Sequence, residues 1–179
     1  MSVTDLLVER NAAHAKGHPG VVPAVEPTLR TLILACGDHR ADPAHAFGLE
    51  ANETVVLRNI GGRVTGGFLH ELVLLVTVGV AEGVESDGFE LVLMHHTDCG
   101  ITRLGGPEHQ ELMAEYFGID ASEVPGKQVT DPYAAVRVDR EVLRSNPLIS
   151  PSLVVSGVVY DVGSGSVNVV CPSAPLGED

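Results

Sequence analysis

Two short motifs, each preceded directly by a run of apolar residues, constrain this chain more than any other feature of its sequence. Cys-Gly-Asp-His-Arg occupies residues 36–40, and His-Thr-Asp-Cys-Gly occupies residues 96–100. Uninterrupted runs of Leu, Val and Ile are typical of buried, usually parallel strands. Ligands of open α/β sheets collect just beyond the carboxyl ends of such strands. If the two strands are neighbours, Cys36, His96 and Cys99 converge at one edge of the sheet.

These three residues offer two thiolates and one imidazole, a donor set that suits zinc. His96 and Cys99 lie close enough in the sequence for one turn of chain to bring both to a single ion, and Cys36 completes the set from the other loop. Three protein ligands leave a fourth position for water, which is typical of catalytic zinc. Each cysteine taken alone would more readily be interpreted as a packed core residue, since free Cys is often buried. The combination favours one zinc ion per chain.

Asp38 and Arg40 add candidate catalytic residues to the same motif. In an extended segment, residues at i, i+2 and i+4 line one face, so both are expected to look at the same small volume as Cys36. Arg40 can hold Asp38 ionised and fixed through charge-assisted hydrogen bonds. A carboxylate held beside a zinc-bound water can accept a hydrogen bond from that water and orient it.

The order of these motifs resembles the signature of the β-class carbonic anhydrases. That family combines Cys-x-Asp-x-Arg, here at 36–40, with a later His-x-x-Cys-Gly, here at 96–100. Residues 55–62 end in Arg-Asn-Ile-Gly-Gly and resemble the family's Arg-Asn-Ala-Gly-Gly stretch, with Ile60 in place of the Ala. Residues 157–165 resemble its late strand and turn. The resemblance therefore runs from about residue 30 to about residue 170.

The resemblance implies reversible hydration of carbon dioxide to bicarbonate and a proton. It assigns Cys36, His96 and Cys99 as zinc ligands, and Asp38 with Arg40 as the dyad that orients a zinc-bound hydroxide. Three alternatives stay open: a hydrolase of carbonyl sulfide or carbon disulfide on the same site, a non-catalytic zinc-binding protein, and a thiol redox protein. The last is disfavoured because the sequence contains no Cys-x-x-Cys.

Composition limits the binding partners and the cellular compartment that are expected for this chain. The 179 residues suit one domain, and 24 acidic against 11 basic residues give a net charge of −13. Such a chain is not expected to bind nucleic acid or anionic membranes, which leaves a small-molecule substrate. No run approaches the roughly 18 apolar residues of a membrane span, and the start is not basic enough for a secretory signal. Three cysteines without a framework spacing predict a reducing compartment, the cytoplasm, with Cys171 as a packed core residue.

Hydrophobic periodicity predicts an α/β fold, with a mostly parallel central sheet, flanking helices and an antiparallel edge strand at the C-terminal end. Strands are expected at 31–36, 54–58, 89–95, 152–161 and 167–170. Helical segments are expected at 3–16, 43–47, 67–80, 108–117 and 133–144, with a loop at 119–132. Successive residues of a strand point to opposite faces, so if His96 reaches the metal, His95 does not. His39 is a possible proton shuttle by residue type, but its loop position does not fix where its side chain lies.

The pattern divides the chain into an N-terminal helix and arm, residues 1–28, and a single α/β zinc-binding catalytic domain, residues 29–179. The arm is rich in Gly and Pro, and an apolar helix on such an arm often packs on a partner subunit. The resemblance agrees, since in this family an N-terminal helix embraces the neighbouring protomer. The segment 67–80 is apolar nearly all round, so part of its surface is expected to meet another subunit. We therefore expect a homodimer or a dimer of dimers.

Overall fold

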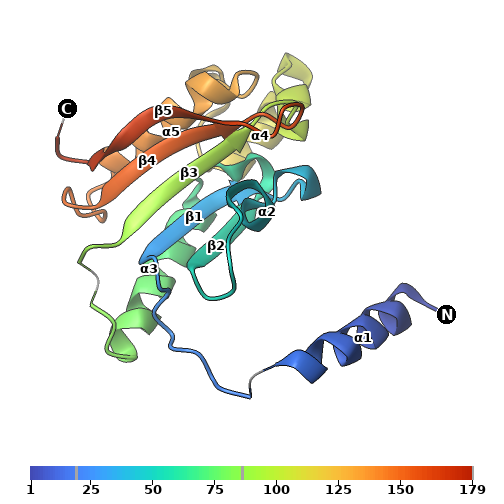
Figure 1. Cartoon of the computed structure of the whole chain (residues 1–179). Helices are drawn as coiled ribbons and strands as arrows, with labels where there is room; N and C mark the ends of the chain where they lie inside the picture. Colours follow the sequence, from blue (N-terminus) through green and yellow to red (C-terminus); the bar gives the residue numbers. More distant parts are fainter. Residues whose placement is uncertain (19, 86, 179) are drawn as a thin grey trace.

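The computed structural model describes residues 1–18, 20–85 and 87–178, so position 19 of the predicted arm and the last residue of the predicted catalytic domain lie outside the described residues. One sheet of five strands, in the order β2-β1-β3-β4-β5, forms the centre of the molecule (Figure 1). The strands are β1 (Thr31–Cys36), β2 (Thr54–Asn59), β3 (Glu90–His96), β4 (Val154–Tyr160) and β5 (Val167–Pro175). The first four are parallel, and β5 pairs antiparallel with β4. This arrangement confirms the predicted fold class.

The strand order places a topological switch point between β1 and β3. The chain leaves β1 for β2 on one side and returns to form β3 on the other side of β1. Ligands of open α/β sheets bind in the crevice beyond the strand ends at such a point. In the parallel register Ala35 lies opposite Met94, so both strands end at the same edge. The two motifs therefore begin at neighbouring strand ends, which is the condition under which their side chains were expected to converge.

The described residues form five α-helices: α1 (Val3–His14), α2 (Pro43–Phe47), α3 (Gly66–Ala81), α4 (Gln110–Phe117) and α5 (Pro132–Arg144). Their starts follow local sequence chemistry. The Thr65 side chain accepts a hydrogen bond from the backbone N–H of Phe68 and caps α3. Asp131 caps α5 in the same way, with Pro132 in the first turn, where a missing N–H costs nothing.

Helices α3 and α5 cover one face of the sheet. Their buried side chains pack on alternate residues of β1, β3 and β4, in a core formed by Leu32, Leu34, Val64, Phe68, Leu72, Leu91, Leu93, Val136, Leu143, Val155, Val159 and Leu176. The segment around α2 contributes to a smaller cluster on the other face, in which Ile33 and Met94 pack against Ala41. Cys171 is buried close to Gly157, as predicted for a packed thiol.

Two details differ from the sequence-based expectations. The predicted loop at 119–132 contains a 3₁₀ helix, Ala121–Lys127, because Asp120 and Glu123 form a reciprocal capping box at its start. Strand β5 continues to Pro175, well past the predicted end at 170, because it follows β4 along its whole length.

The N-terminal helix and one side of α3 lie outside the core. Helix α1 stands away from the sheet at the end of an extended arm and buries none of its residues within the described part of the chain (Figure 1). Helix α3 buries Phe68 and Leu72, whereas Leu74 and Val78 are exposed. The single chain thus leaves exposed the kind of apolar surface on α3 that was expected to meet another subunit. No helix among the described residues is long and apolar enough to cross a membrane.

Candidate metal centre

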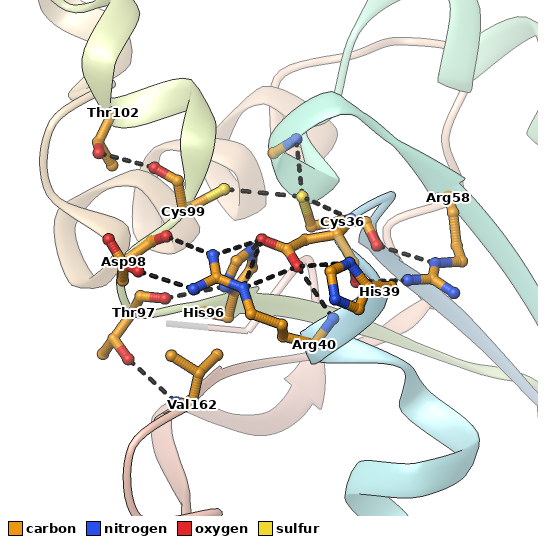
Figure 2. A network of polar contacts seen from close by, with 12 residues as sticks. Cys36, His39, Arg40, Arg58, His96, Thr97, Asp98, Cys99, Thr102 and Val162 are labelled. Carbon is orange, nitrogen blue, oxygen red and sulfur yellow. Dashed lines mark hydrogen bonds and ion pairs between the residues drawn. The ribbon is translucent and has the colours of Figure 1, made fainter.

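The side chains of Cys36, His96 and Cys99 meet at the switch point between β1 and β3 (Figure 2). One potential ligand atom from each lies within 4.8 Å of the other two, and all three residues are buried. The two sulfur atoms are 3.6 Å apart. Both cysteines pack in an apolar cluster with Met113 and Phe117 of α4. The predicted convergence of these residues is thus confirmed as geometry.

The ring of His96 is oriented for a ligand. Its Nδ1 lies 2.9 Å from the carbonyl oxygen of Thr97, which places the ring proton on Nδ1 as the donor. Its Nε2 is buried and has no hydrogen-bond partner among the described residues. A free lone pair buried beside two thiols is what a metal ligand presents. His95 turns the other way, with its Nε2 3.2 Å from Asp139 Oδ2, as the alternation along the strand predicted.

The two thiols differ in how readily they lose a proton. Hydrogen bonding from the Cys99 thiol, followed by contacts with His96 and with the backbone N–H groups of Asp38 and Gly61, lowers the pKa of Cys36 to about 4 although burial opposes the shift. The Cys36 sulfur and burial together raise the pKa of Cys99 well above its usual range. The pair therefore presents one thiolate readily, and a bound cation would favour release of the second proton.

Two consecutive glycines bring the backbone against the cysteine. Gly61 has φ +82° and donates its N–H to Cys36 Sγ at 3.3 Å. Gly62 has φ +65°, and a Cβ at this position would lie 2.9 Å from backbone atoms of Ala35 and Cys36. Only glycine fits both the left-handed conformation and the close approach. The Gly-Gly pair of the sequence is thus a packing requirement of the strand end that carries Cys36.

Asp38 and Arg40 form the ion pair that the sequence predicted. Arg40 Nη2 donates to Asp38 Oδ2 at 2.7 Å, and Arg40 Nε donates to Asp38 Oδ1 at 3.1 Å. The segment was expected to be extended, but it forms a 3₁₀ turn over His39–Ala41. Asp38 caps this turn, because its side chain accepts a hydrogen bond from the Arg40 backbone N–H. Hydrogen bonds from Arg40 hold the pKa of Asp38 well below its usual range, against the effect of burial. Asp38 is therefore an ionised acceptor.

The carboxylate of Asp38 adjoins the potential ligand atoms. Asp38 Oδ2 lies 4.0 Å from His96 Nε2, the nitrogen without a hydrogen-bond partner in the described part of the chain. His39, in contrast, is 93% exposed in its side chain and stays 3.9 Å from Asp38 Oδ1. The geometry gives Asp38, and not His39, a direct position beside the candidate metal centre.

Arg58 braces the first loop, a function that the sequence did not reveal. Its Nε donates to the Cys36 carbonyl at 2.8 Å (Figure 2). Its Nη2 donates to the Asp38 carbonyl at 2.7 Å, and its Nη1 pairs with Asp42. The only signal was its place in the Arg-Asn-Ile-Gly-Gly stretch. Its acceptors are backbone carbonyls on another strand end, which no residue pattern identifies.

A buried ionic network lies next to the metal centre and holds the elements around it together. Arg63 follows the two glycines, and its Nε and Nη2 donate to Asp139 of α5 at 2.8 and 3.0 Å. Asp139 also accepts from the Val64 backbone N–H at 3.1 Å and contacts His95, the residue before the potential ligand His96. The network ties the glycine turn, β3 and α5 together.

Comparison of the sequence and of the structure with known proteins indicates the family of the chain. No family model matches the sequence. The solved structure of carbonic anhydrase from Streptococcus mutans is 33% identical, has a TM-score of 0.74, and covers 95% of this chain and 98% of that one. Beta-carbonic anhydrase 1 of Mycobacterium tuberculosis is 28% identical over 172 residues, which are 96% of this chain and 100% of the relative.

A third relative carries a different name. Carbon disulfide hydrolase of Acidianus sp. is 26% identical over 170 residues, with 79% of this chain and 77% of the relative covered. The similarity to the two carbonic anhydrases extends over almost their whole length, and it accompanies the five-stranded sheet and the Cys-His-Cys cluster described above. The chain belongs to the β-carbonic anhydrase family.

Proposed function

We propose that the protein catalyses the zinc-dependent, reversible hydration of carbon dioxide to bicarbonate and a proton. The observation that carries this proposal is the meeting of Cys36, His96 and Cys99 at one strand edge, with the Asp38 carboxylate held beside them by Arg40. Family membership supports the same reaction, since relatives named carbonic anhydrase align over nearly their full length.

The residues present fit a zinc ion. Two buried thiols and the Nε2 of His96, which lacks a hydrogen-bond partner among the residues described, form a Cys2His donor set. The separations between these atoms allow a single ion to reach all three. We propose Cys36, His96 and Cys99 as the ligands of one zinc ion per chain. When bound, zinc would supply Lewis-acid activation of a water molecule.

Asp38 and Arg40 carry the chemistry that the protein itself supplies. An ionised carboxylate can only accept hydrogen bonds, so Asp38 accepts from the attacking water and directs its lone pair toward the carbon of the substrate. Arg40 keeps Asp38 ionised and prevents its rotation, because it donates from Nε and Nη2 to that carboxylate. Arg58 fixes the backbone that carries Asp38. The positions of Asp38 and the cluster thus bring the nucleophile and its orienting group together before substrate arrives.

A hydrolase of carbon disulfide or carbonyl sulfide is the second candidate. Both compounds are linear and attacked at carbon, and a relative named carbon disulfide hydrolase shares 26% identity with the chain. Purified protein with a measured zinc content should be assayed for carbon dioxide hydration and, in parallel, for release of hydrogen sulfide from both sulfur compounds. We expect the highest kcat/KM with carbon dioxide. A higher value with either sulfur compound would favour the hydrolase, and bound zinc without turnover of any of the three would favour a non-catalytic zinc-binding protein.

We further propose that residues 1–28 form a subunit-contact arm on a catalytic domain of residues 29–179. Leu7 and Val8 on α1 and Leu74 on α3 are exposed apolar residues in a single chain, which is typical of surfaces that a second copy covers. Sedimentation of the full chain should give a dimer or a dimer of dimers, and Leu7→Asp should weaken it. A monomeric wild-type protein would contradict this arrangement. The three free cysteines, two of them needed as ligands, favour a reducing compartment such as the cytoplasm.

A further inference from the structure

Asp98 lies between two of the proposed ligands and faces Arg40 from the opposite loop (Figure 2). Arg40 Nη1 donates to Asp98 Oδ2 at 2.8 Å, and Arg40 Nη2 donates to the Asp98 backbone carbonyl at 3.0 Å. We propose that Asp98 is a positioning residue, which holds the Arg40 guanidinium from the second loop and thereby fixes the orientation of Asp38. This proposal rests on the proposed function, in which Asp38 orients the attacking water.

The guanidinium of Arg40 is gripped along two edges. Asp38 occupies the edge formed by Nε and Nη2, and Asp98 occupies the edge formed by Nη1 and Nη2. A guanidinium is planar with fixed donor directions, so acceptors on two edges determine its plane and its rotation within that plane. With Asp38 alone as its partner, the pair could pivot as a unit on the flexible Arg40 side chain. Asp98 removes that freedom.

The backbone of Asp98 agrees with this function. Its φ is +51°, in the left-handed region that is uncommon for residues other than Gly, Asn and Asp. In this conformation both its carbonyl and its carboxylate reach the same guanidinium. The following turn is tied down independently, because the Thr102 hydroxyl donates to the Cys99 carbonyl at 2.7 Å.

The contact is too exposed to be explained by folding stability. The side chains of Arg40 and Asp98 are 40% and 56% exposed, and ion pairs of such exposure contribute little to the free energy of unfolding. Orientation of a group beside the reacting atoms is a function that such a pair can perform, since it needs geometry and not a large energy.

The left-handed backbone decides which variants test the proposal. Asp98→Gly removes the side chain and keeps a residue suited to φ +51°, whereas Ala would add backbone strain. Asp98→Asn keeps the backbone preference and one acceptor oxygen but removes the charge. Arg103→Gln is the matched control, because Arg103 pairs with Asp98 Oδ1 at 3.2 Å on the solvent side and does not contact Asp38 in the described hydrogen bonds.

The first readout is steady-state hydration, normalised to bound zinc. We expect Asp98→Gly to lower kcat about tenfold with little change in KM, because displacement of a positioning group by about 1 Å costs up to roughly a hundredfold in rate. Asp98→Asn should lie between Asp98→Gly and wild type, and Arg103→Gln should stay near wild type. Equal losses in Asp98→Gly and Arg103→Gln would overturn the proposal, since they would reflect a general effect of surface charge.

The second readout does not depend on activity. The Nε–H resonance of Arg40, assigned by its absence in Arg40→Lys, should be resolved in the wild-type nitrogen–proton NMR spectrum. In Asp98→Gly it should move toward the position of freely rotating arginines, while the Arg103→Gln spectrum keeps it in place. An unchanged resonance in Asp98→Gly would overturn the proposal. A displaced resonance in a protein whose wild type does not hydrate carbon dioxide would support the hold on Arg40 and overturn only the proposed function.

Discussion

Removal of the buried carboxylate of Asp139 should destabilise the protein more than any exposed charge substitution. Asp139 is 0% exposed and its partner Arg63 is 1% exposed. Asp139 accepts both Arg63 donors, at 2.8 and 3.0 Å, and the backbone N–H of Val64 at 3.1 Å. Asp139→Ala leaves the guanidinium charge buried, with the Lys127 carbonyl as its remaining described hydrogen-bond acceptor.

The magnitude follows from burial. Breaking a buried ion pair by removing one partner costs about 3–5 kcal/mol, because the other charge stays uncompensated. Replacing both partners by apolar residues removes that penalty. The double variant Arg63→Met/Asp139→Leu should therefore be more stable than Asp139→Ala, although Val64 N–H still loses its acceptor at a cost of about 1–3 kcal/mol.

Urea unfolding followed by far-UV circular dichroism measures this. Protein and zinc concentrations must be equal for all variants, because metal binding and self-association add to the apparent stability. With an m-value of about 2 kcal/mol/M, the midpoint of Asp139→Ala should fall by about 1.5–2.5 M. A fall below about 0.5 M, or a double variant less stable than Asp139→Ala, would refute the reasoning that the network is a mutually dependent pair.

Three further predictions concern the site and its support. Cys99→Ala should lose zinc, because two donors cannot complete the set, and metal analysis after dialysis checks this; stoichiometric zinc in that variant would exclude Cys99 as a ligand. Gly62→Ala should lower the free energy of unfolding by about 2 kcal/mol or more, because a Cβ there would lie 2.9 Å from backbone atoms. Gly118→Ala is the control: its φ is +70° but no atom lies within 4 Å of the added Cβ, so it should cost only backbone strain of about 1 kcal/mol. Equal losses in urea unfolding would show that packing at the strand end does not matter. Burial raises the pKa of Asp139, but His95 and Arg63 outweigh this and leave it lowered; its contribution to stability is therefore present above the unfolded pKa of about 3.9 and is lost as the pH falls through the lower folded value. Unfolding curves of Asp139→Asn should thus depend less on pH below about 4 than those of the wild type, and identical slopes would contradict the assignment.

The sequence predicted most of the fold because its local signals agree with the tertiary structure. The apolar runs before Cys36 and His96 are buried strands, as their composition predicted. The 3₁₀ helix at Ala121–Lys127 was missed because its capping box lies in a segment with Gly and Pro and no apolar periodicity.

The site was predicted in part. Residue types and spacing predicted that Cys36, His96 and Cys99 would meet as a possible metal-ligand set, and their side chains do come together. The supporting contacts of Arg58 and Asp98 could not be predicted, because they depend on which backbone carbonyls two distant loops present to a guanidinium. Asp139 was equally hidden, as its partners Arg63 and His95 lie far away in the sequence and meet it only when α5 packs on the sheet.

The central claim is that the protein hydrates carbon dioxide. Zinc would be held by Cys36, His96 and Cys99, and Asp38 would orient the attacking water. Zinc should be titrated into metal-free wild type and Asp38→Asn while hydration is followed by stopped flow. We predict that both bind one zinc per chain, that wild-type activity rises linearly and stops at one equivalent, and that Asp38→Asn is at least about a hundredfold slower. Wild-type activity that does not depend on zinc, or equal activity in Asp38→Asn, would contradict the account.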